Sequence, residues 1–173
     1  FTENPGLSHD KIVLYLPTFR ERDAYVAEQL KVEFRGLDGY HLIISAHPLF
    51  SKIKIEDEFS YSGDFSTYDL MKIADVIITD YSACAFEASV LMKPLYFFVP
   101  DYDEYSSERG INVNLKEEMP SATFENAEEL VNAIKSENYD FDMLYKFKCE
   151  YVENTKANNA EILAKFISML LKA

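Results

Sequence analysis

The chain has 173 residues, 48% of them apolar, and its 17 Lys and Arg stand against 30 Asp and Glu, a formal net charge of −13. This size and apolar content predict one well-packed globular domain and argue against disorder. The acidic excess is spread over both halves of the chain without a Lys/Arg stripe, so the composition argues against nucleic acid as a partner.

Short apolar runs alternate with helical patterns through the first hundred residues. Four such runs predict strands at residues 12–16, 41–45, 75–79 and 95–99. Apolar positions at helical spacing predict helices between them, at residues 21–34, 67–74 and 82–92. This alternation predicts an α/β fold, a doubly wound parallel sheet with helices on both faces.

The pattern changes beyond residue 101, where a stretch rich in polar residues predicts loops. Asp101, Asp103 and Glu104 in this stretch lack the Gly and terminal Glu of a calcium loop, so we interpret them as a solvated acidic turn. Three further helices are predicted at residues 126–136, 141–152 and 157–172.

Ligands of open α/β sheets bind beyond the carboxyl ends of the strands. The segments that follow the four predicted strands are polar, at residues 17–20, 46–48, 80–83 and 100–110. Ser82 opens a predicted helix, whose first N–H groups and positive dipole end favour a phosphate. Glu87, one turn further on, can accept both hydroxyls of a ribose or another diol. Alternatively, Asp80 or Ser82 only caps the helix and Glu87 is a solvated surface residue.

Arg20 and His47 are the other candidates for chemistry at the strand ends. The planar fork of Arg20 suits a diphosphate, although a surface ion pair with Asp23 explains the same residue. His47 could donate to a phosphoryl oxygen or protonate a leaving phosphate, and the alternative is a hydrogen-bonded loop histidine. Cys84 and the aromatic run 96–98 are interpreted as packing residues.

Cysteine use and hydropathy predict a cytoplasmic location. Cys84 and Cys149 are the only cysteines, and neither lies at CxxC or metal-ligand spacing, which suits a reducing compartment. No run of about eighteen apolar residues is present to span a bilayer, and the first residues lack the pattern of a signal peptide. The missing initiator Met suggests an excised piece of a longer protein.

Four segments together resemble the CDP-glycerol glycerophosphotransferases and related polyol-phosphate transferases of teichoic acid synthesis. These segments are residues 14–20, 45–48, 77–83 and 109–110, which read LYLPTFR, SAHP, IITDYSA and RG. They follow the order of the family's motifs, and the tail of the chain is similar as well. The resemblance therefore runs over almost the whole chain.

The resemblance implies a Rossmann-like fold, the carboxyl-terminal, nucleotide-binding half of a GT-B type transferase. Residues 1–173 would form a single donor-nucleotide-binding domain, with C-terminal helical segments from about residue 125 and the acceptor domain absent from this chain. A primer or polymer hydroxyl would attack the β-phosphorus of CDP-glycerol or CDP-ribitol and release CMP. Neither a metal nor another cofactor is implied. The acceptor would be lipid-linked, with the parent protein peripheral at the inner face of the cell membrane.

The same resemblance implies a role for each site residue. His47, the implied catalytic residue, would stabilise or protonate the leaving phosphate. Ser82 and the helix start would cradle a phosphate, and Glu87 would hold a diol. The implied contacts with the nucleotide diphosphate are Pro17, Thr18 and Arg20. The whole implied substrate site is Pro17, Thr18, Arg20, Ser45, Ala46, His47, Asp80, Ser82, Ala83, Glu87 and Arg109.

Two departures from the family leave the exact polyol open: Ala83 replaces a usual second Ser, and Glu87 replaces a common Asp. Without an acceptor domain, the isolated chain would not turn over. One alternative is a GT-B glycosyltransferase or sugar-nucleotide epimerase domain that uses a UDP-sugar, which the His-Pro and Asp-Tyr-Ser segments disfavour. Another is a non-catalytic α/β binding module, in which Arg20, His47 and Ser82 would be unconstrained.

Overall fold

The computed structural model describes residues 10–18, 23–46, 55–61, 64–152 and 158–171. Within them lies one sheet of five strands, all parallel, in the order β2-β1-β3-β4-β5. The strands are β1 (Lys11–Leu16), β2 (Tyr40–Ile44), β3 (Val76–Thr79), β4 (Leu95–Phe98) and β5 (Thr123–Phe124). The predicted parallel sheet is confirmed, and it has one strand more than predicted.

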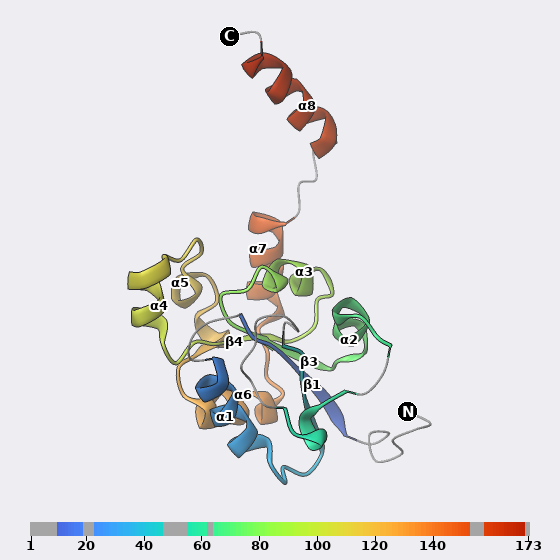
Figure 1. Ribbon diagram of the computed structural model, residues 1–173, viewed down its shortest axis with the longest axis vertical. Coiled ribbons are helices and arrows are strands. Elements are labelled where there is room, and N and C mark those ends of the chain that lie inside the picture. Colours follow the sequence, from blue (N-terminus) through green and yellow to red (C-terminus); the bar gives the residue numbers. More distant parts are fainter. Residues whose placement is uncertain (1–9, 19–22, 47–54, 62–63, 153–157, 172–173) are drawn as a thin grey trace.

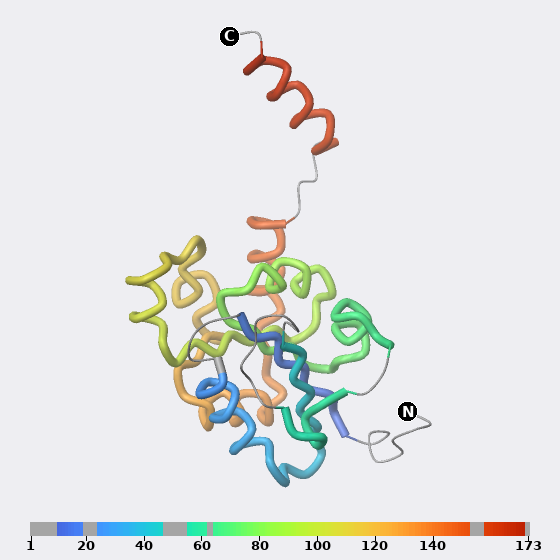
Figure 2. The backbone as a smooth tube through the Cα atoms, in the orientation of Figure 1, coloured from blue at the N-terminus to red at the C-terminus, as the bar shows by residue number. Residues whose placement is uncertain are grey.

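Helices cover both faces of the sheet (Figure 1). α1 (Asp23–Phe34) and α6 (Ala127–Ser136) pack against each other on one face, and Figure 2 shows them side by side. The other face carries α2 (Thr67–Ile73), α3 (Cys84–Val90) and α7 (Phe141–Tyr151), with α3 packed on α7. Because both faces are covered, β3 and β4 carry only buried residues. Strands of this kind read as continuous apolar runs.

The stretch between β4 and α6 differs from the predicted loops. It contains α4 (Tyr102–Arg109), α5 (Leu115–Glu118), a 3-10 turn (Pro120–Ala122) and β5. α4 buries no side chain, so its sequence has no apolar stripe to reveal a helix, and β5 has only two residues. The predicted acidic turn is the start of α4, where Asp103 and Glu104 are exposed in the first turn.

The last helix, α8 (Asn159–Leu170), stands apart from the body of the fold (Figure 1). It lies within the predicted segment 157–172. None of its side chains is buried, and Ile162, Leu163 and Phe166 are 50%, 59% and 55% exposed. In the described parts of the chain, no helix combines the length and the hydropathy needed to cross a membrane.

The aromatic run of β4 forms part of the core, as predicted. Tyr96 is 3% exposed, and Phe97 and Phe98 are fully buried. Phe97 packs edge-on against Phe147 of α7, with ring centroids 6.1 Å apart. Burying one such side chain contributes about 1.5–3 kcal/mol. The contact of Phe97 with Phe147 holds β4 to the helical layer that contains α7.

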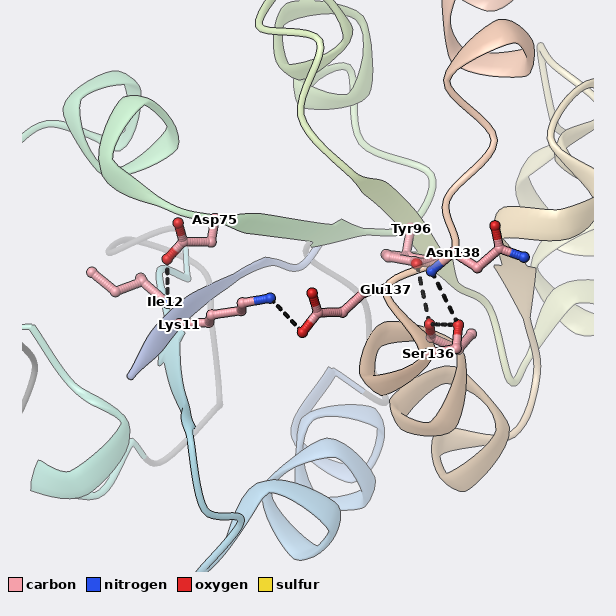
Figure 3. A network of polar contacts seen from close by, with 8 residues as sticks. Lys11, Ile12, Asp75, Tyr96, Ser136, Glu137 and Asn138 are labelled. Carbon is pink, nitrogen blue, oxygen red and sulfur yellow. Dashed lines mark hydrogen bonds and ion pairs between the residues drawn. The ribbon is translucent and has the colours of Figure 1, made fainter. Parts of the chain in front are cut away.

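Polar contacts at the amino ends of the strands tie β1 to its neighbours (Figure 3). Asp75 Oδ2 accepts the backbone N–H of Ile12 at 2.8 Å, and Lys11 Nζ pairs with Glu137 Oε1 at 2.6 Å. Glu137 ends α6 in the left-handed backbone conformation, with φ of 54°. These contacts lie at the edge opposite to the carboxyl ends of the strands, so we assign them a structural role.

A nearly buried lysine anchors the segment that leads to α2. Lys31 on α1 is 2% exposed, and its ammonium pairs with Glu56 Oε2 at 2.8 Å and with Glu28 Oε2 at 3.2 Å. The hydrogen bond from Lys31 lowers the pKa of Glu56 below its ordinary value of 4.5. Residues 55–61 are thereby tied to α1.

We expect Glu56→Gln to lower the free energy of unfolding at neutral pH and to have less effect in acid. Because the folded-state pKa of Glu56 is lowered, the contribution of the pair is present above its ordinary pKa of 4.5 and is lost as the pH falls through the folded value. Urea unfolding of both proteins at neutral pH and well below 4.5 measures this difference. Glu108→Gln, on the exposed α4, is the control. An equal loss at both pH values would contradict the assignment.

Candidate functional site

The strand order places a crevice between β1 and β3. From β1 the chain continues to β2 on one side and then crosses to β3 on the other side. Such a reversal leaves a crevice at the carboxyl ends of the two central strands, where open α/β sheets bind ligands. Leu16 of β1 pairs with Thr79 of β3 at this edge. The segments that follow the two strands therefore meet there.

A buried carboxylate joins these two strand ends. Asp80 is 1% exposed, and its Oδ1 and Oδ2 accept the backbone N–H of Thr18 at 2.9 and 3.0 Å. The Thr18 hydroxyl donates to Asp80 Oδ1 at 2.5 Å. One residue back, the Thr79 hydroxyl donates to the Leu16 carbonyl at 2.8 Å. The carboxylate of Asp80 therefore sets the position of the segment after β1.

Ser82 does not open the helix, in contrast to the helix predicted for residues 82–92; it lies two residues before Cys84, where α3 begins. Its Oγ accepts the backbone N–H of Cys84 at 3.3 Å, while Ala83 is the N-cap residue and makes no side-chain cap bond. Among the described residues, this long hydrogen bond is the one contact that supports Ser82 as a helix-capping residue. Cys84 itself is half-buried against the core. The start of a helix carries partial positive charge, so Ser82 lies where an anion would be stabilised.

A pocket of about 270 Å³ opens beside the start of α3. Its polar lining includes Asp80, Ser82, Arg109 and Asn112. Its apolar lining includes Phe86, Phe97, Val113, Leu115 and Phe147. The pocket thus joins the β3 end to the segment around α4 and α5. Its polar side chains include hydrogen-bond donors for a phosphorylated ligand, beside apolar side chains.

Stacked aromatic rings connect α4, which carries Arg109, to the end of β3. The rings of Tyr81 and Tyr105 lie 3.8 Å apart with an interplanar angle of 11°. The Arg109 guanidinium lies 5.9 Å from the Tyr105 ring centroid, and the Tyr81 hydroxyl donates to Asp101 Oδ1 at 3.1 Å. The sequence does not reveal this arrangement, because its only local signal is a segment after β4 that contains Tyr and Arg residues.

Glu87 occupies a different position from the other site residues. It is exposed on α3, does not line the pocket, and accepts a hydrogen bond from the Tyr68 hydroxyl of α2 at 3.1 Å. This bond raises the pKa of Tyr68 above its ordinary value of 10. No sequence signal connected these two residues, which are 19 positions apart.

The structure brings most of the described candidates to one edge of the sheet. Thr18, Asp80, Ser82, Ala83 and Arg109 lie around the crevice and its pocket. The end of β2 adjoins them, since the backbone N–H of residue 45 donates to the carbonyl of residue 15 at 3.0 Å. Ser45, Ala46 and Pro17 are accordingly at this edge. Arg20 and His47 lie outside the described residues.

The opposite edge of the sheet holds a second pocket, of about 260 Å³. It is lined by residues before β1 and around the α1–β2 turn, including Asp10, Arg35 and His41. Burial lowers the pKa of His41. None of the predicted site residues lines this pocket. Among the residues that the structure describes, no group of three or more His, Cys, Asp and Glu side chains could hold a metal ion.

The parallel sheet and its crevice define a Rossmann-like α/β fold of the GT-B type, as predicted, and similarity to known proteins gives the family. Residues 2–169 match the family model described as CDP-Glycerol:Poly(glycerophosphate) glycerophosphotransferase. The chain belongs to this family.

Two curated relatives are bacterial primases. The teichoic acid ribitol-phosphate primase of Bacillus spizizenii is 34% identical over 96% of this chain and 46% of the relative. The teichoic acid glycerol-phosphate primase of Bacillus subtilis is 30% identical over 96% of this chain and 45% of the relative. The chain thus spans about half the length of the curated relatives that it matches.

Two solved structures are similar to this chain. A structure of the wall teichoic acid polymerase TagF, soaked with CDPG, superposes with a TM-score of 0.61 at 27% identity, over 96% of this chain and 44% of that chain. The S. aureus MnaA-UDP structure superposes with a TM-score of 0.50 at 14% identity, over 81% of this chain and 40% of that chain. This second likeness shows the fold alone.

We expect Asp80→Ala to lower the free energy of unfolding by about 2 kcal/mol, because it leaves two partly buried donors of Thr18 without their acceptor. Thr18→Val, which keeps the backbone N–H, should cost about 1 kcal/mol. Urea unfolding measures both losses. Asp103→Asn, an exposed carboxylate on α4, is the control and should change stability by less than about 0.5 kcal/mol. Equal stability of Asp80→Ala and Asp103→Asn would contradict the role of Asp80.

Proposed function

We propose that this chain is the donor-binding part of a polyol-phosphate transferase. It would bind a CDP-linked polyol, CDP-glycerol or CDP-ribitol, for transfer of the polyol phosphate to a teichoic acid or another surface-polymer primer. The main support for the proposal is the family match over residues 2–169. In addition, Thr18, Asp80 and Ser82 lie together at the edge of the sheet where open α/β sheets bind ligands. The names of the relatives, glycerol- and ribitol-phosphate primases, agree with it.

In this proposal each strand end supplies part of the donor site. Ser82, Ala83 and the start of α3 hold a phosphate, and Arg109 adds a cation at the pocket. Asp80 keeps the segment after β1 in place for substrate. The remaining donor contacts, carried over from the resemblance, are Pro17, Thr18, Arg20, Ser45, Ala46 and His47. Glu87 accepts the hydroxyls of a diol.

The proposed reaction is a displacement at phosphorus. An acceptor hydroxyl attacks the β-phosphorus, its oxygen forms the new phosphodiester bond, and CMP leaves with the electron pair of the broken bond. The proton of the hydroxyl passes to a base outside this sequence. Such a reaction depends on positioning and on charge stabilisation, which Arg20 and the start of α3 would provide. His47 would stabilise or protonate the departing phosphate.

We also propose that the acceptor site belongs to a part of the polypeptide outside this sequence. The chain corresponds to under half the length of the two primases and of TagF, which leaves room for a second domain in such proteins. Residues 1–173 would then form the donor domain and bind the nucleotide without turnover. Because the proposed acceptor is lipid-linked, the complete enzyme would act peripherally at the inner face of the cell membrane.

The first test of the proposed function is calorimetric titration of the chain with CDP-glycerol, CDP-ribitol, CDP and a UDP-sugar. We expect binding that requires the cytidine diphosphate, with a ranking of the two polyols. Preference for the UDP-sugar would instead support a glycosyltransferase or epimerase domain. A folded chain that binds none of the four ligands would contradict its role as a donor-binding unit.

Arg20→Ala should weaken the affinity for CDP by about 1.5–3 kcal/mol, the range for hydrogen bonds to charged groups. The measurement is the same titration, with folding checked by circular dichroism. Arg35→Ala is a matched control, since Arg35 pairs with Glu58 at the opposite edge of the sheet. If Arg20→Ala and Arg35→Ala bound CDP equally well, Arg20 would not belong to the site.

His47→Ala in the complete enzyme should lower kcat more than it raises KM. The reason is that a group acting on the leaving phosphate contributes mainly in the transition state. Steady-state kinetics with varied donor concentration give both constants. A change confined to KM would show that His47 only binds the donor.

A further inference from the structure

Helix α4 carries Arg109 but lacks the buried apolar face that usually holds a helix on a fold. None of its side chains is buried, and it lies beside α5 at the periphery of the fold (Figure 1). Aromatic side chains tie it to the neighbouring segments instead. The Tyr102 hydroxyl donates to Asn114 Oδ1 at 2.8 Å, and Lys116 Nζ lies 4.2 Å from the centroid of the Tyr102 ring. A second ring, that of Tyr105, makes the contact closer to Arg109.

Tyr81 is the platform on which Tyr105 rests. It follows Asp80 in the chain, and it is itself partly buried against the core. Its hydroxyl donates to Asp101 Oδ1 at 3.1 Å, which ties the residue before α4 to the same ring. The Tyr105 ring lies 3.8 Å from the Tyr81 ring at an angle of 11°. The position of Tyr105 is thereby set by the end of β3.

Arg109 lies one turn further along α4, over the Tyr105 ring. The distance of 5.9 Å from the guanidinium to the ring centroid is within the range of a cation–π attraction. Arg109 is exposed and lines the pocket together with Ser82. Among the described residues, no acidic side chain forms an ion pair with Arg109. Its charge is therefore available to an anionic ligand, and the Tyr105 ring limits where that charge lies.

We propose that Tyr105 is a positioning residue for Arg109, an inference that rests on the proposed function. The stack on Tyr81 fixes the ring, and the ring holds the guanidinium at the pocket before the donor arrives. A phosphate group in the pocket then meets both the start of α3 and a cation that is already in place. Because ordering a long side chain on binding costs affinity, an arginine held in advance binds the phosphate more tightly.

The experiment is calorimetric titration of the chain with CDP-glycerol. Arg109→Ala should weaken binding about tenfold or more, as expected for loss of a charged hydrogen-bond donor. Tyr105→Ala should weaken it about three- to tenfold, through loss of the cation–π contact and of the ordering of Arg109. Urea unfolding of each variant checks that it is folded.

Two conservative variants separate positioning from packing. Tyr105→Phe keeps the aromatic face and should bind CDP-glycerol nearly as the wild type does. Tyr105→Leu keeps an apolar side chain against Tyr81 but has no π-face, so it should lose affinity as Tyr105→Ala does. If Tyr105→Leu binds as tightly as the wild type, Tyr105 only anchors α4 and the proposal is overturned.

A double variant tests whether Tyr105 acts through Arg109. Tyr105→Ala should cause no further loss of affinity when Arg109 has already been replaced by Ala, because the group that it positions is then missing. Losses that add in the double variant would show that Tyr105 acts independently of Arg109, which contradicts the proposal.

Tyr145→Ala is the matched control. Tyr145 is 53% exposed on α7, with Lys148 Nζ 5.4 Å from its ring centroid, and it does not line the pocket. Removal of this ring should leave the binding of CDP-glycerol unchanged. If the wild type binds but Arg109→Ala or Tyr105→Ala behaves as Tyr145→Ala does, the positioning role is overturned while the proposed function stands. A folded wild-type chain that does not bind CDP-glycerol overturns both.

Discussion

The buried carboxylate of Asp80 is the constraint on which the site depends. It accepts both the backbone N–H and the hydroxyl of Thr18, so the segments after β1 and β3 cannot separate without leaving polar groups unsatisfied inside the protein. Two neighbouring strands end at the crevice created by the reversal of strand order, and this pairing holds their ends in register. Ser82 and the start of α3 are positioned by the same turn.

The two edges of the sheet serve different purposes. At the amino ends, Lys11 and Asp75 connect β1 to the elements beside it, and these contacts are structural. At the carboxyl ends lie a pocket, a helix start and Arg109. A chain with a formal net charge of −13 repels anions at long range, so a phosphorylated donor must be held by such local donors. Local groups of this kind favour selective recognition over general attraction to anions.

The sequence was sufficient to predict the sheet and the edge that carries the site, because strands buried on both faces leave continuous apolar runs and their carboxyl ends must converge. The sequence was not sufficient to predict α4 or β5. A helix without buried side chains has no apolar stripe, and a strand of two residues is too short to show an alternating pattern. The contact of Tyr68 with Glu87 also escaped prediction, since it depends on how two helices are placed in space. The roles of Arg20 and His47 stay predictions.

We propose that a cytidine diphosphate binds across the carboxyl edge of the sheet, between β1 and β3. The most direct measurement is a two-dimensional amide NMR titration of the isotope-labelled chain with CDP. We expect the largest shift changes at Thr18, at residues 80–87 and at Tyr68, and no change in the backbone of residues 35–41 at the opposite edge. Shift changes centred on residues 35–41, or none anywhere at saturating CDP, would contradict it.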